Sequence, residues 1–381
     1  MKLAIITSHP IQYNAPLFAF LAKEKNMDLK VFYTWGEDVL ESKFDPDFGK
    51  IINWDIPLLE GYSYQFTINI SKEPGSHHYF GIINPNLISE ILEWKPDAIW
   101  VWGWAFDSHL KVMRHFSGKI PVWFRGDSTL LDEKKGFSVR KILRRIFLKW
   151  VYSHIDKAFY VGTHNKEYFR KHGLSENQLI YAPHAIDNER FFDFNGEKKK
   201  LAAIWKDSLG IKTEEFVLLF AGKLEPRKNP LFLIDLMKNI DSNWHLLIVG
   251  NGPLEKDLKM KFKLNRRVHF IDFQNQSHMP IVYRLADYLI LPSISETWGL
   301  AINEALASGT KVIASVNCGG AIDLINKNNG HIIYNLRNSL EFFKTIEVVN
   351  SNLNKESMLL GHSYQDILDA LNGCSIDNKF S

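Results

Sequence analysis

The sequence is poor in cysteine and in net charge. Cys318 and Cys374 are its two cysteines, too few for a disulfide framework, and we expect a reducing compartment. The formal net charge is +3 over 381 residues, and such a small excess does not indicate a nucleic acid partner. The composition therefore predicts a chain without covalent cross-links, in which 45% apolar residues suffice for ordinary cores.

Long apolar runs are missing as well. No stretch of about eighteen apolar residues occurs, so the sequence predicts no membrane-spanning helix. The segment from Met1 to Pro10 has too short an apolar part for a signal peptide. We therefore expect a cytoplasmic protein.

Short apolar runs alternate with helical patterns along the chain. Runs that are apolar on both faces are typical of buried parallel strands. In the first half we expect strands at Leu3–Ile6, Leu29–Tyr33, Ala98–Trp102, Pro121–Phe124 and Ala158–Val161. In the second half we expect them at Val217–Phe220, His245–Val249, Val268–Ile271, Tyr288–Leu291 and Lys311–Ala314. The alternation predicts an α/β protein with two Rossmann-like, doubly wound parallel-sheet domains.

The domain boundary is expected in a polar stretch. The change is best placed after Ile186 and Asp187, in the lysine-rich run from Phe194 to Lys200. We predict an N-terminal domain over residues 1–190 and a C-terminal domain over residues 200–358.

The most informative feature is a pair of glutamates, Glu296 and Glu304, in the run SETWGLAINEAL. Glu296 follows an expected strand, and Glu304 lies in a helix that we expect Gly299 and Leu300 to open. With Thr297 as N-cap, the N–H groups of the first helical turn lie between the two carboxylates and form an anion site. This order of acid, phosphate cradle and acid suits a polyol on either side of a diphosphate.

A cationic turn follows the first expected strand of the second half. The run GKLEPRKNP begins at Gly222. Lys223 and Lys228 flank the turn and could both reach one departing anion, with Arg227 as a third candidate. The alternative interpretation is a solvated charge run.

A glycine turn follows the next expected strand. Gly250 and Gly252 form a Gly-x-Gly sequence, but Glu255 stands where a dinucleotide fingerprint has its third glycine. We interpret this segment as a tight turn that lines a cleft, rather than as a nicotinamide site.

The order and spacing of these motifs, followed by Cys318-Gly-Gly, resemble the C-terminal domain of the retaining GT-B glycosyltransferases of family 4, over roughly residues 200–335. The resemblance implies a GT-B fold whose C-terminal half binds a nucleotide-sugar donor across a cleft from an acceptor-binding N-terminal half. It also implies that a last helix, near residues 360–373, crosses back to the first domain. It implies neither a metal nor another cofactor.

The resemblance further implies roles for single residues. Lys223 and Lys228 would neutralise the charge on the leaving diphosphate, helped by the amides of residues 298–300. Glu304 would hold the ribose hydroxyls, and Glu296 the transferred sugar. The acceptor would attack from the leaving-group face, with a donor phosphate oxygen taking its proton, so that configuration is retained. Other donor contacts are expected from Gly222, Arg227, Gly250, Gly252, Thr297, Trp298, Gly299 and Leu300.

The N-terminal half departs from the family after its first strand. A polar segment replaces the usual glycine-rich turn, and from it we expect acceptor contacts by His9, Gln12, Tyr13 and Asn14. A structural role for the loop histidine His9 is the alternative.

A second departure follows the fourth expected strand. Many family members have a histidine where this chain has the run Phe124 to Ser128. Arg125 could contact a phosphate and Asp127 an acceptor hydroxyl, or Asp127 could cap a turn. His184 takes the place of an asparagine in the segment that links the two domains in the family, where a hinge role is expected.

The segment from Arg140 to Tyr152 has five basic residues and an apolar face at helical spacing. We expect the apolar side to pack on the first domain and the basic side to be solvated. The alternative is a peripheral helix on an anionic membrane surface, the inner face of the plasma membrane. The acceptor would then be a saccharide carried on a lipid, in surface polysaccharide synthesis such as O-antigen or capsule.

Two other functions fit the same architecture. One is a non-catalytic nucleotide-sugar-binding subunit, against which the intact charges at Lys223, Lys228, Glu296 and Glu304 argue. The other is a nucleotide-sugar epimerase, which nucleotide release with and without an acceptor would separate from a transferase.

Overall fold

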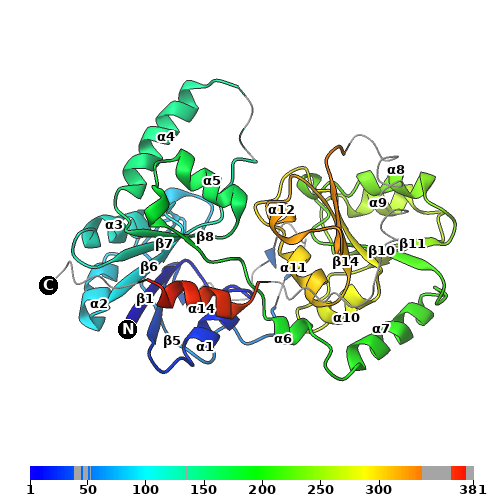
Figure 1. Cartoon of the computed structure of the whole chain (residues 1–381), viewed down its shortest axis with the longest axis horizontal. Coiled ribbons are helices and arrows are strands. Elements are labelled where there is room, and N and C mark those ends of the chain that lie inside the picture. The colour runs from blue at the N-terminus through cyan, green and yellow to red at the C-terminus, as the bar shows by residue number, and fades with distance from the viewer. Residues whose placement is uncertain are drawn as a thin grey trace. The chain divides into compact units, whose positions relative to one another are not determined.

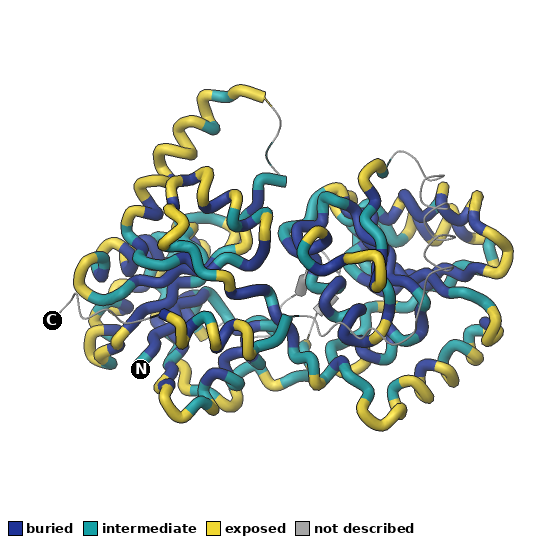
Figure 2. The backbone as a smooth tube through the Cα atoms, viewed as in Figure 1, coloured by how far each residue is buried: buried dark blue, intermediate teal, exposed yellow. Residues whose placement is uncertain are grey.

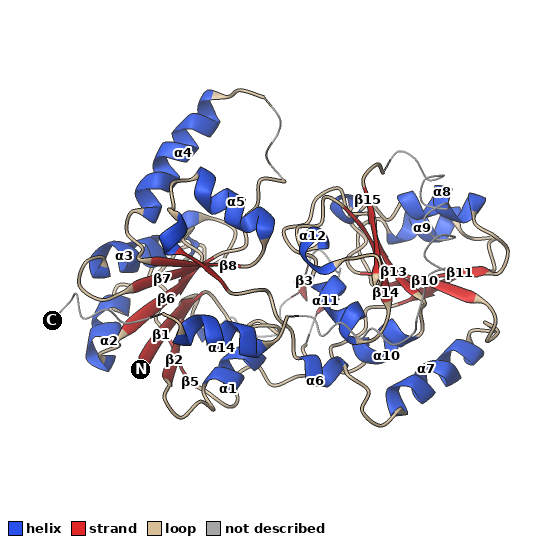
Figure 3. Ribbon diagram, viewed as in Figure 1, coloured by secondary structure: helices blue, strands red, loops and turns tan. Residues whose placement is uncertain are grey.

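The computed structural model describes residues 1–37, 44–45, 50–51, 53–131, 133, 136–336 and 362–374. The chain divides into two compact units. The first comprises Met1–Lys43, Pro57–His184 and Tyr364–Ser381, and the second comprises Phe44–Ile56 and Ala185–Ser363. Each unit is a parallel sheet with helices on its faces (Figure 3).

The first unit contains a seven-stranded sheet in the order β5-β2-β1-β6-β7-β8-β9. Its strands are β1 (Lys2–Thr7), β2 (Asp28–Tyr33), β5 (Ser63–Phe66), β6 (Ala98–Trp102), β7 (Val122–Arg125), β8 (Lys157–Tyr160) and β9 (Leu179–Tyr181). All its neighbouring strands pair in parallel. Four successive residues of β1, Leu3 to Ile6, have no exposed surface, as expected for a strand covered on both faces.

Helices from both ends of the chain cover this sheet (Figure 1). They are α1 (Ala15–Leu21), η2 (Tyr79–Gly81), α2 (Leu87–Trp94), α3 (Asp107–Phe116), α4 (Val139–Tyr152), α5 (Thr163–Lys171), η3 (Glu176–Gln178) and α14 (Tyr364–Asn372). Helix α14 packs on α1 and β9 and buries Ile367, Leu368 and Leu371. The predicted return of the last helix to the first domain is confirmed.

The second unit contains a six-stranded sheet in the order β12-β11-β10-β13-β14-β15. Its strands are β10 (Phe216–Ala221), β11 (Trp244–Val249), β12 (Val268–Ile271), β13 (Tyr288–Leu291), β14 (Lys311–Ser315) and β15 (Gly330–Ile333). Its helices are α6 (Asn188–Phe191), α7 (Glu197–Ser208), η4 (Pro226–Lys228), α8 (Phe232–Asn239), α9 (Glu255–Lys261), α10 (Met279–Arg284), α11 (Leu300–Ala307) and α12 (Ala321–Leu324).

A piece of the N-terminal sequence belongs to this second unit. It includes the antiparallel strands β3 (Phe44–Asp45) and β4 (Lys50–Ile51). The Trp54 ring meets the Phe273 ring at 6.0 Å, and the Ser277 amide donates to Asp55 at 3.1 Å. No sequence pattern predicted this excursion.

The strand order indicates where a sheet of this type binds its ligand. Numbered along the chain, the strands of the second sheet run 3-2-1-4-5-6, the order of dinucleotide-binding folds, whose ligands bind where the order reverses, at the carboxyl ends of the strands. This point lies between β10 and β13, and in the first sheet it lies between β1 and β6. The predicted pair of doubly wound parallel-sheet domains is confirmed.

Helix α4 contradicts the packing expected from its pattern. Its buried residues are Leu148, Val151 and Tyr152, all near its C-terminal end. Leu143 and Ile146 are 62% and 63% exposed, and most of the helix has the yellow of exposed residues in Figure 2. The expectation that the whole apolar side packs on the domain was wrong, because only the last turns reach the core.

Candidate nucleotide-sugar site

The loops that follow β10 and β13 are joined by hydrogen bonds at the switch point of the second sheet. The Asn229 side chain donates to the Pro292 carbonyl at 3.1 Å, and the Ile294 amide donates to the Arg227 carbonyl at 2.9 Å. Asn229 has a φ of 55°, a left-handed conformation that asparagine tolerates better than most residues. The two predicted loops are thus held side by side.

This junction brings Lys228 and Glu296 together. The Lys228 ammonium forms an ion pair with the Glu296 carboxylate, and the Ser293 hydroxyl donates to the same carboxylate oxygen at 3.4 Å. The two side chains are 20% and 12% exposed, so the pair is only partly screened by solvent. A cation and an acid that the sequence assigned to separate tasks are therefore neighbours.

The loop before α11 is locked to a second loop that follows β14. The Glu296 amide donates to the Asn317 carbonyl, and the Gly319 amide donates to the Glu296 carbonyl, both at 3.0 Å. A Cβ atom on Gly319 would lie 1.9 Å from the Thr297 carbonyl oxygen, so only glycine fits there. The Cys318-Gly-Gly motif thus supports the backbone that carries Glu296.

Cys318 itself is not available as a nucleophile. Burial, reinforced by the Glu296 carboxylate, raises the pKa of its thiol to about 12. A thiol with so high a pKa remains protonated at neutral pH.

Helix α11 begins two residues later than the predicted cap implies. Its N-cap is Gly299, with a φ of 93°, so the expectation that Thr297 caps the helix was wrong. The left-handed conformation, which glycine adopts without strain, turns the chain into Leu300. The Trp298 indole points inward and donates to Asn303 at 2.8 Å. The anion contacts predicted for residues 298–300 are therefore those of their backbone amides and not of the Trp298 side chain.

Glu304 is held from another helix. The Tyr283 hydroxyl, on α10, donates to Glu304 Oε2 at 2.6 Å. Burial raises the pKa of the Glu304 carboxyl above its usual value, although the Tyr283 hydrogen bond and the Arg190 charge oppose this shift. Within the described residues Oε1 accepts no hydrogen bond, which leaves it for a ligand hydroxyl.

Tyr283 and Arg190 were missed in the sequence. Tyr283 lies in a helical segment where nothing distinguishes it from a core aromatic, and Arg190 lies in the short helix α6 after the first unit ends. Their approach to Glu304 depends on tertiary packing, which local patterns do not encode.

Gly250 and Gly252 pack against the cationic loop. Cβ atoms at these positions would lie 2.2 Å from the Gly222 carbonyl oxygen and 2.7 Å from the Leu224 amide nitrogen. The Leu224 amide in turn donates to the Asn251 carbonyl at 3.0 Å. The glycine turn therefore supports the loop that carries Lys223, and its predicted donor contact stays a prediction.

The remaining cationic residues differ in exposure. Lys223 follows Gly222 at the end of β10 and is half-buried, whereas Arg227 lies in η4 and is exposed. Of the three, Lys228 contacts the loop before α11 through its side chain and Arg227 through its backbone, and a cation beside a helix N-terminus is a combination that can bind a diphosphate.

In the first unit the predicted polar loop follows β1. His9 accepts or donates a 2.9 Å hydrogen bond with Ser8, and burial lowers the pKa of its imidazole to about 4. His9 is therefore neutral at neutral pH. Gln12 and Tyr13 are half-buried, and Asn14 is buried as the N-cap of α1, without a side-chain hydrogen bond to the helix.

Arg125 ends β7 and Asp127 follows the strand, and the two residues differ in burial. The buried Arg125 guanidinium donates to the carbonyls of Ala182 and Pro183 at 2.8 and 3.0 Å. This contact ties the end of β7 to the segment that ends the first unit. Its role is structural here, and the predicted phosphate contact stays a prediction.

Asp127 is exposed, but its charge affects the pKa values of Arg125 and Tyr13. Burial lowers the pKa of Arg125 to about 10, and the Asp127 carboxylate opposes this shift. Burial, followed by the same carboxylate, raises the pKa of Tyr13 to about 12. Burial and Arg125 hold the pKa of His184 well below its usual value. The structure thus gathers Tyr13, Arg125 and Asp127 at one end of the first sheet.

The part of the chain that the structure describes has neither a candidate metal cluster nor a candidate membrane-spanning helix. Within that part of the chain, no group of three histidine, cysteine, aspartate or glutamate residues could hold a metal ion. In the same residues, each helix is too short or too polar to cross a bilayer.

The two Rossmann-like units define a GT-B architecture, in which the loops that carry Lys228 and Glu296 meet beside the second switch point. Residues 202–358 match the family model described as glycosyl transferases group 1. This part of the chain is therefore similar to the glycosyl transferases of group 1.

Two curated relatives extend the match into the first unit. One is the UDP-Gal:alpha-D-GlcNAc-diphosphoundecaprenol alpha-1,3-galactosyltransferase of Escherichia coli, 31% identical over 57% of this chain and 59% of its own. The other is the GalNAc-alpha-(1->4)-GalNAc-alpha-(1->3)-diNAcBac-PP-undecaprenol alpha-1,4-N-acetyl-D-galactosaminyltransferase of Campylobacter jejuni, 26% identical over 60% and 59%. This chain spans between 28% and 59% of the length of the curated relatives it matches.

A solved structure covers the whole fold. It is that of Anabaena HepE in complex with UDP and glucose, with a TM-score of 0.62, 16% identity, and coverage of 100% of this chain and 97% of the other. At this identity the likeness establishes the fold alone.

Proposed function

We propose that this chain is a retaining glycosyltransferase of family 4. It moves a hexosyl or N-acetylhexosaminyl group from a nucleotide-diphosphate sugar to a saccharide hydroxyl. The donor binds the second unit, and the acceptor binds the first.

One observation carries the proposal. Lys228, Glu296 and the N-terminus of α11 meet at the switch point of the second sheet, and Glu304 lies on the same helix with one carboxylate oxygen held by Tyr283. A cation and helix amides suit a diphosphate, whereas the carboxylates suit the hydroxyl groups of the ribose and the sugar.

The chemistry follows from these positions. As the bond between sugar and diphosphate breaks, negative charge grows on the phosphate, and Lys223 and Lys228 stabilise it. Glu304 accepts from the ribose hydroxyls, and Glu296 orients the transferred sugar. The acceptor hydroxyl attacks from the leaving-group face and gives its proton to a phosphate oxygen, so the new glycosidic bond keeps the configuration of the old one. Asp127 orients the acceptor.

We further propose a lipid-linked acceptor in surface polysaccharide synthesis. The names of the Escherichia coli and Campylobacter jejuni relatives specify acceptors linked to undecaprenol through a diphosphate. The exposed face of α4 joins apolar residues such as Leu143 and Ile146 to basic residues such as Arg140. Such a face suits the anionic cytoplasmic surface of a membrane.

The test begins with the donor. Thermal shift with UDP, GDP and ADP sugars should identify one that raises the melting temperature, since a ligand that binds only the folded state stabilises it. Nucleotide release should then depend on a saccharide acceptor, and NMR of the product should show retained configuration. Conversion of the donor to an epimeric nucleotide sugar, without net nucleotide release, would indicate the epimerase alternative, and an inverted product would refute the proposed mechanism.

A further inference from the structure

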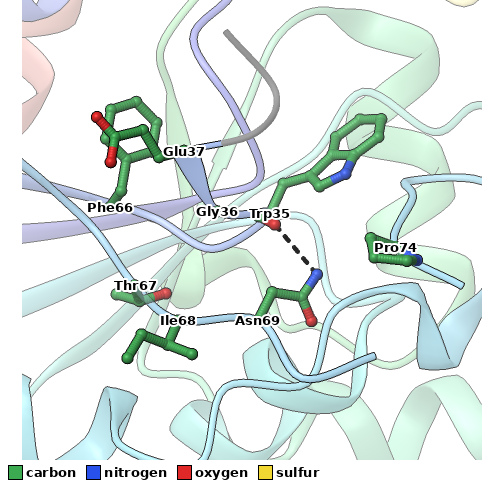
Figure 4. A pocket seen from close by; sticks show the side chains of 8 residues that line it. All are labelled: Trp35, Gly36, Glu37, Phe66, Thr67, Ile68, Asn69 and Pro74. Carbon is green, nitrogen blue, oxygen red and sulfur yellow. Dashed lines mark hydrogen bonds between the residues drawn. The ribbon is translucent and has the colours of Figure 1, made fainter. Parts of the chain in front are cut away.

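The first unit contains a pocket apart from the residues assigned to the acceptor above. It has a volume of about 410 Å³, and its lining includes Trp35, Glu37, Phe66, Thr67, Asn69 and Pro74 (Figure 4). These residues follow β2 and β5 or, in the case of Phe66, end β5, and the two strands are neighbours in the sheet. The volume lies in the range of about 300–1,000 Å³ that is typical of small-molecule sites.

Hydrogen bonds build the floor of this pocket. The Asn69 amide group donates to the carbonyls of Trp35 and Gly81 at 3.1 and 2.9 Å, the first of which Figure 4 shows. The Asn69 oxygen accepts from the amides of Ser71 and Ile83 at 3.1 and 2.9 Å. Asn69 therefore uses both its donors and both its lone pairs within the protein. It fixes the shape of the pocket and leaves ligand contacts to other residues.

The lining combines apolar faces with a few hydroxyl partners. Trp35, Phe66 and Pro74 contribute rings to the lining, whereas Glu37 adds an exposed carboxylate. The Thr67 hydroxyl donates to the Tyr33 carbonyl at a long 3.4 Å, so its oxygen can still accept a hydrogen bond. Such a lining matches a sugar ring, which has apolar C–H faces and a rim of hydroxyl groups.

Charge and position distinguish between ligand classes. Among the described residues the lining includes no cation, and Glu37 would repel a phosphate, so a nucleotide or a diphosphate is disfavoured. The rings of His9 and Trp35 form a T-shaped contact with a centroid distance of 5.1 Å, which joins the pocket to the polar loop after β1. The pocket thus continues the acceptor side of the first unit outward, toward the edge strand β5.

We propose that this pocket binds a neutral saccharide ring, as a second subsite for the acceptor beyond the sugar that is glycosylated. The subsite rests on the proposed function for its role, although the binding itself does not require transfer. It makes Trp35 a stacking platform and Glu37 a hydroxyl acceptor. It also makes the enzyme prefer an acceptor of at least two sugars.

Saturation-transfer NMR tests the binding directly. The probes are methyl glycosides of glucose, galactose, N-acetylglucosamine and N-acetylgalactosamine, with disaccharides of the same sugars. Trp35→Leu and Glu37→Gln should each weaken the affinity for the bound saccharide about fivefold to tenfold. Phe80→Leu is the matched control, because Phe80 is an exposed aromatic residue of the same unit that does not line the pocket.

The outcomes separate the subsite from the proposed function. The subsite is supported if both pocket variants weaken saccharide binding and Phe80→Leu does not. If Trp35→Leu fails to fold, Glu37→Gln alone provides the test. The absence of binding by every probe, or equal binding by all variants, overturns it. Thermal shift with UDP, GDP and ADP sugars on the same samples tests the proposed function separately. A thermal shift by a nucleotide sugar without saccharide binding would refute only the subsite. Saccharide binding without any thermal shift by a nucleotide sugar would refute only the transferase function.

Discussion

At the scale of single residues, the ion pair between Lys228 and Glu296 links the two ends of the proposed donor. We propose that Lys228 binds the diphosphate and that Glu296 binds the sugar. The diphosphate therefore competes with Glu296 for Lys228, and the sugar competes with Lys228 for Glu296. A diphosphate must share the Lys228 charge with a half-buried carboxylate, and it must also approach that carboxylate closely. Glu296 should therefore weaken the binding of the nucleotide product while it helps the transfer step.

Glu296→Gln tests this opposition. Because the amide leaves Lys228 unpaired, the affinity for the free nucleoside diphosphate should rise about fivefold, the equivalent of about 1 kcal/mol. Turnover should fall, because the contact to the transferred sugar is lost in the transition state. Calorimetry and initial rates measure the two effects, and Glu225→Gln, at an acid on the loop that carries Lys228, should change neither. Weaker nucleotide binding by Glu296→Gln would contradict the competition.

Glu304→Gln should separate binding from stability. Loss of a charged acceptor for the ribose should weaken nucleotide binding by about 1.5–3 kcal/mol. The fold should not suffer, because burial opposes the ionised carboxyl and glutamine can still accept from Tyr283.

The same variant has a pH signature. The pKa of Glu304 is raised above 4.5 in the folded state. Its stabilising contribution is therefore present below about pH 4.5 and is lost as the pH rises through the folded pKa. The melting temperature of the wild type relative to Glu304→Gln should fall as the pH rises toward neutrality. A difference that is independent of pH would show that the carboxyl is ionised without cost.

At the scale of elements, the loop before α11 depends on its contact with the loop after β14. A methyl group on Gly319 would collide with the Thr297 carbonyl, so Gly319→Ala must displace the backbone that carries Glu296. We expect a loss of about 1–3 kcal/mol in stability and loss of the thermal shift by nucleotide. Gly309→Ala adds a methyl group in open space at a φ of +79°, and it should be strained but keep the nucleotide shift. Normal nucleotide binding by Gly319→Ala would exclude this supporting role.

Helix α4 is tested through its exposed apolar face. Flotation with anionic liposomes should show binding that weakens with salt, because the surface potential is screened within about 8 Å at physiological ionic strength. Ile146→Ser should reduce binding. Ile204→Ser is the control, since Ile204 lies on the lysine-rich helix α7 and is 67% exposed, close to the 63% of Ile146. Equal losses in both variants, or binding that is indifferent to salt, would argue against α4 as the contact.

The elements also show how far the sequence could be interpreted. Ten strands were predicted from apolar runs, and all ten are present. The missed strands of the two large sheets, β5, β9 and β15, all lie at sheet edges. Edge strands have one neighbour and less burial, as at Ser63 and Tyr64 of β5, which are exposed, so they need no continuous apolar run.

Candidate site residues, like the strands, could be predicted only where a local sequence pattern marks them. Glu296, Glu304 and the lysines were found because they follow strands in a recognisable order. Tyr283 and the pocket at Trp35 were not, because their neighbours are distant in sequence. The packing of helix α4 was predicted wrongly because an apolar face indicates that the face is shielded from water, but it does not specify what covers it.

At the scale of the whole molecule, the first unit depends on the last described helix. Leu371 of α14 is 1% exposed, and Leu371→Ala should cost about 2–5 kcal/mol. Hydrogen exchange should become faster in β9, which α14 contacts, while β10 of the second unit remains protected. Leu264→Ala, at a residue 94% exposed, is the control. Unchanged exchange in β9 would mean that α14 contributes little to the first unit.

The return of α14 also has a consequence for biosynthesis. The ribosome completes residues 1–184 long before it makes Tyr364–Asn372, yet both belong to one unit. At a synthesis rate of about 5–20 residues per second, the surface that α14 will cover on α1 and β9 stays open to water for roughly 10–40 s. The nascent chain therefore passes through a period in which its first unit is nearly complete but leaves this apolar surface exposed. During that period chaperones, or a neighbouring copy on the same messenger RNA, can bind the surface before its own helix does.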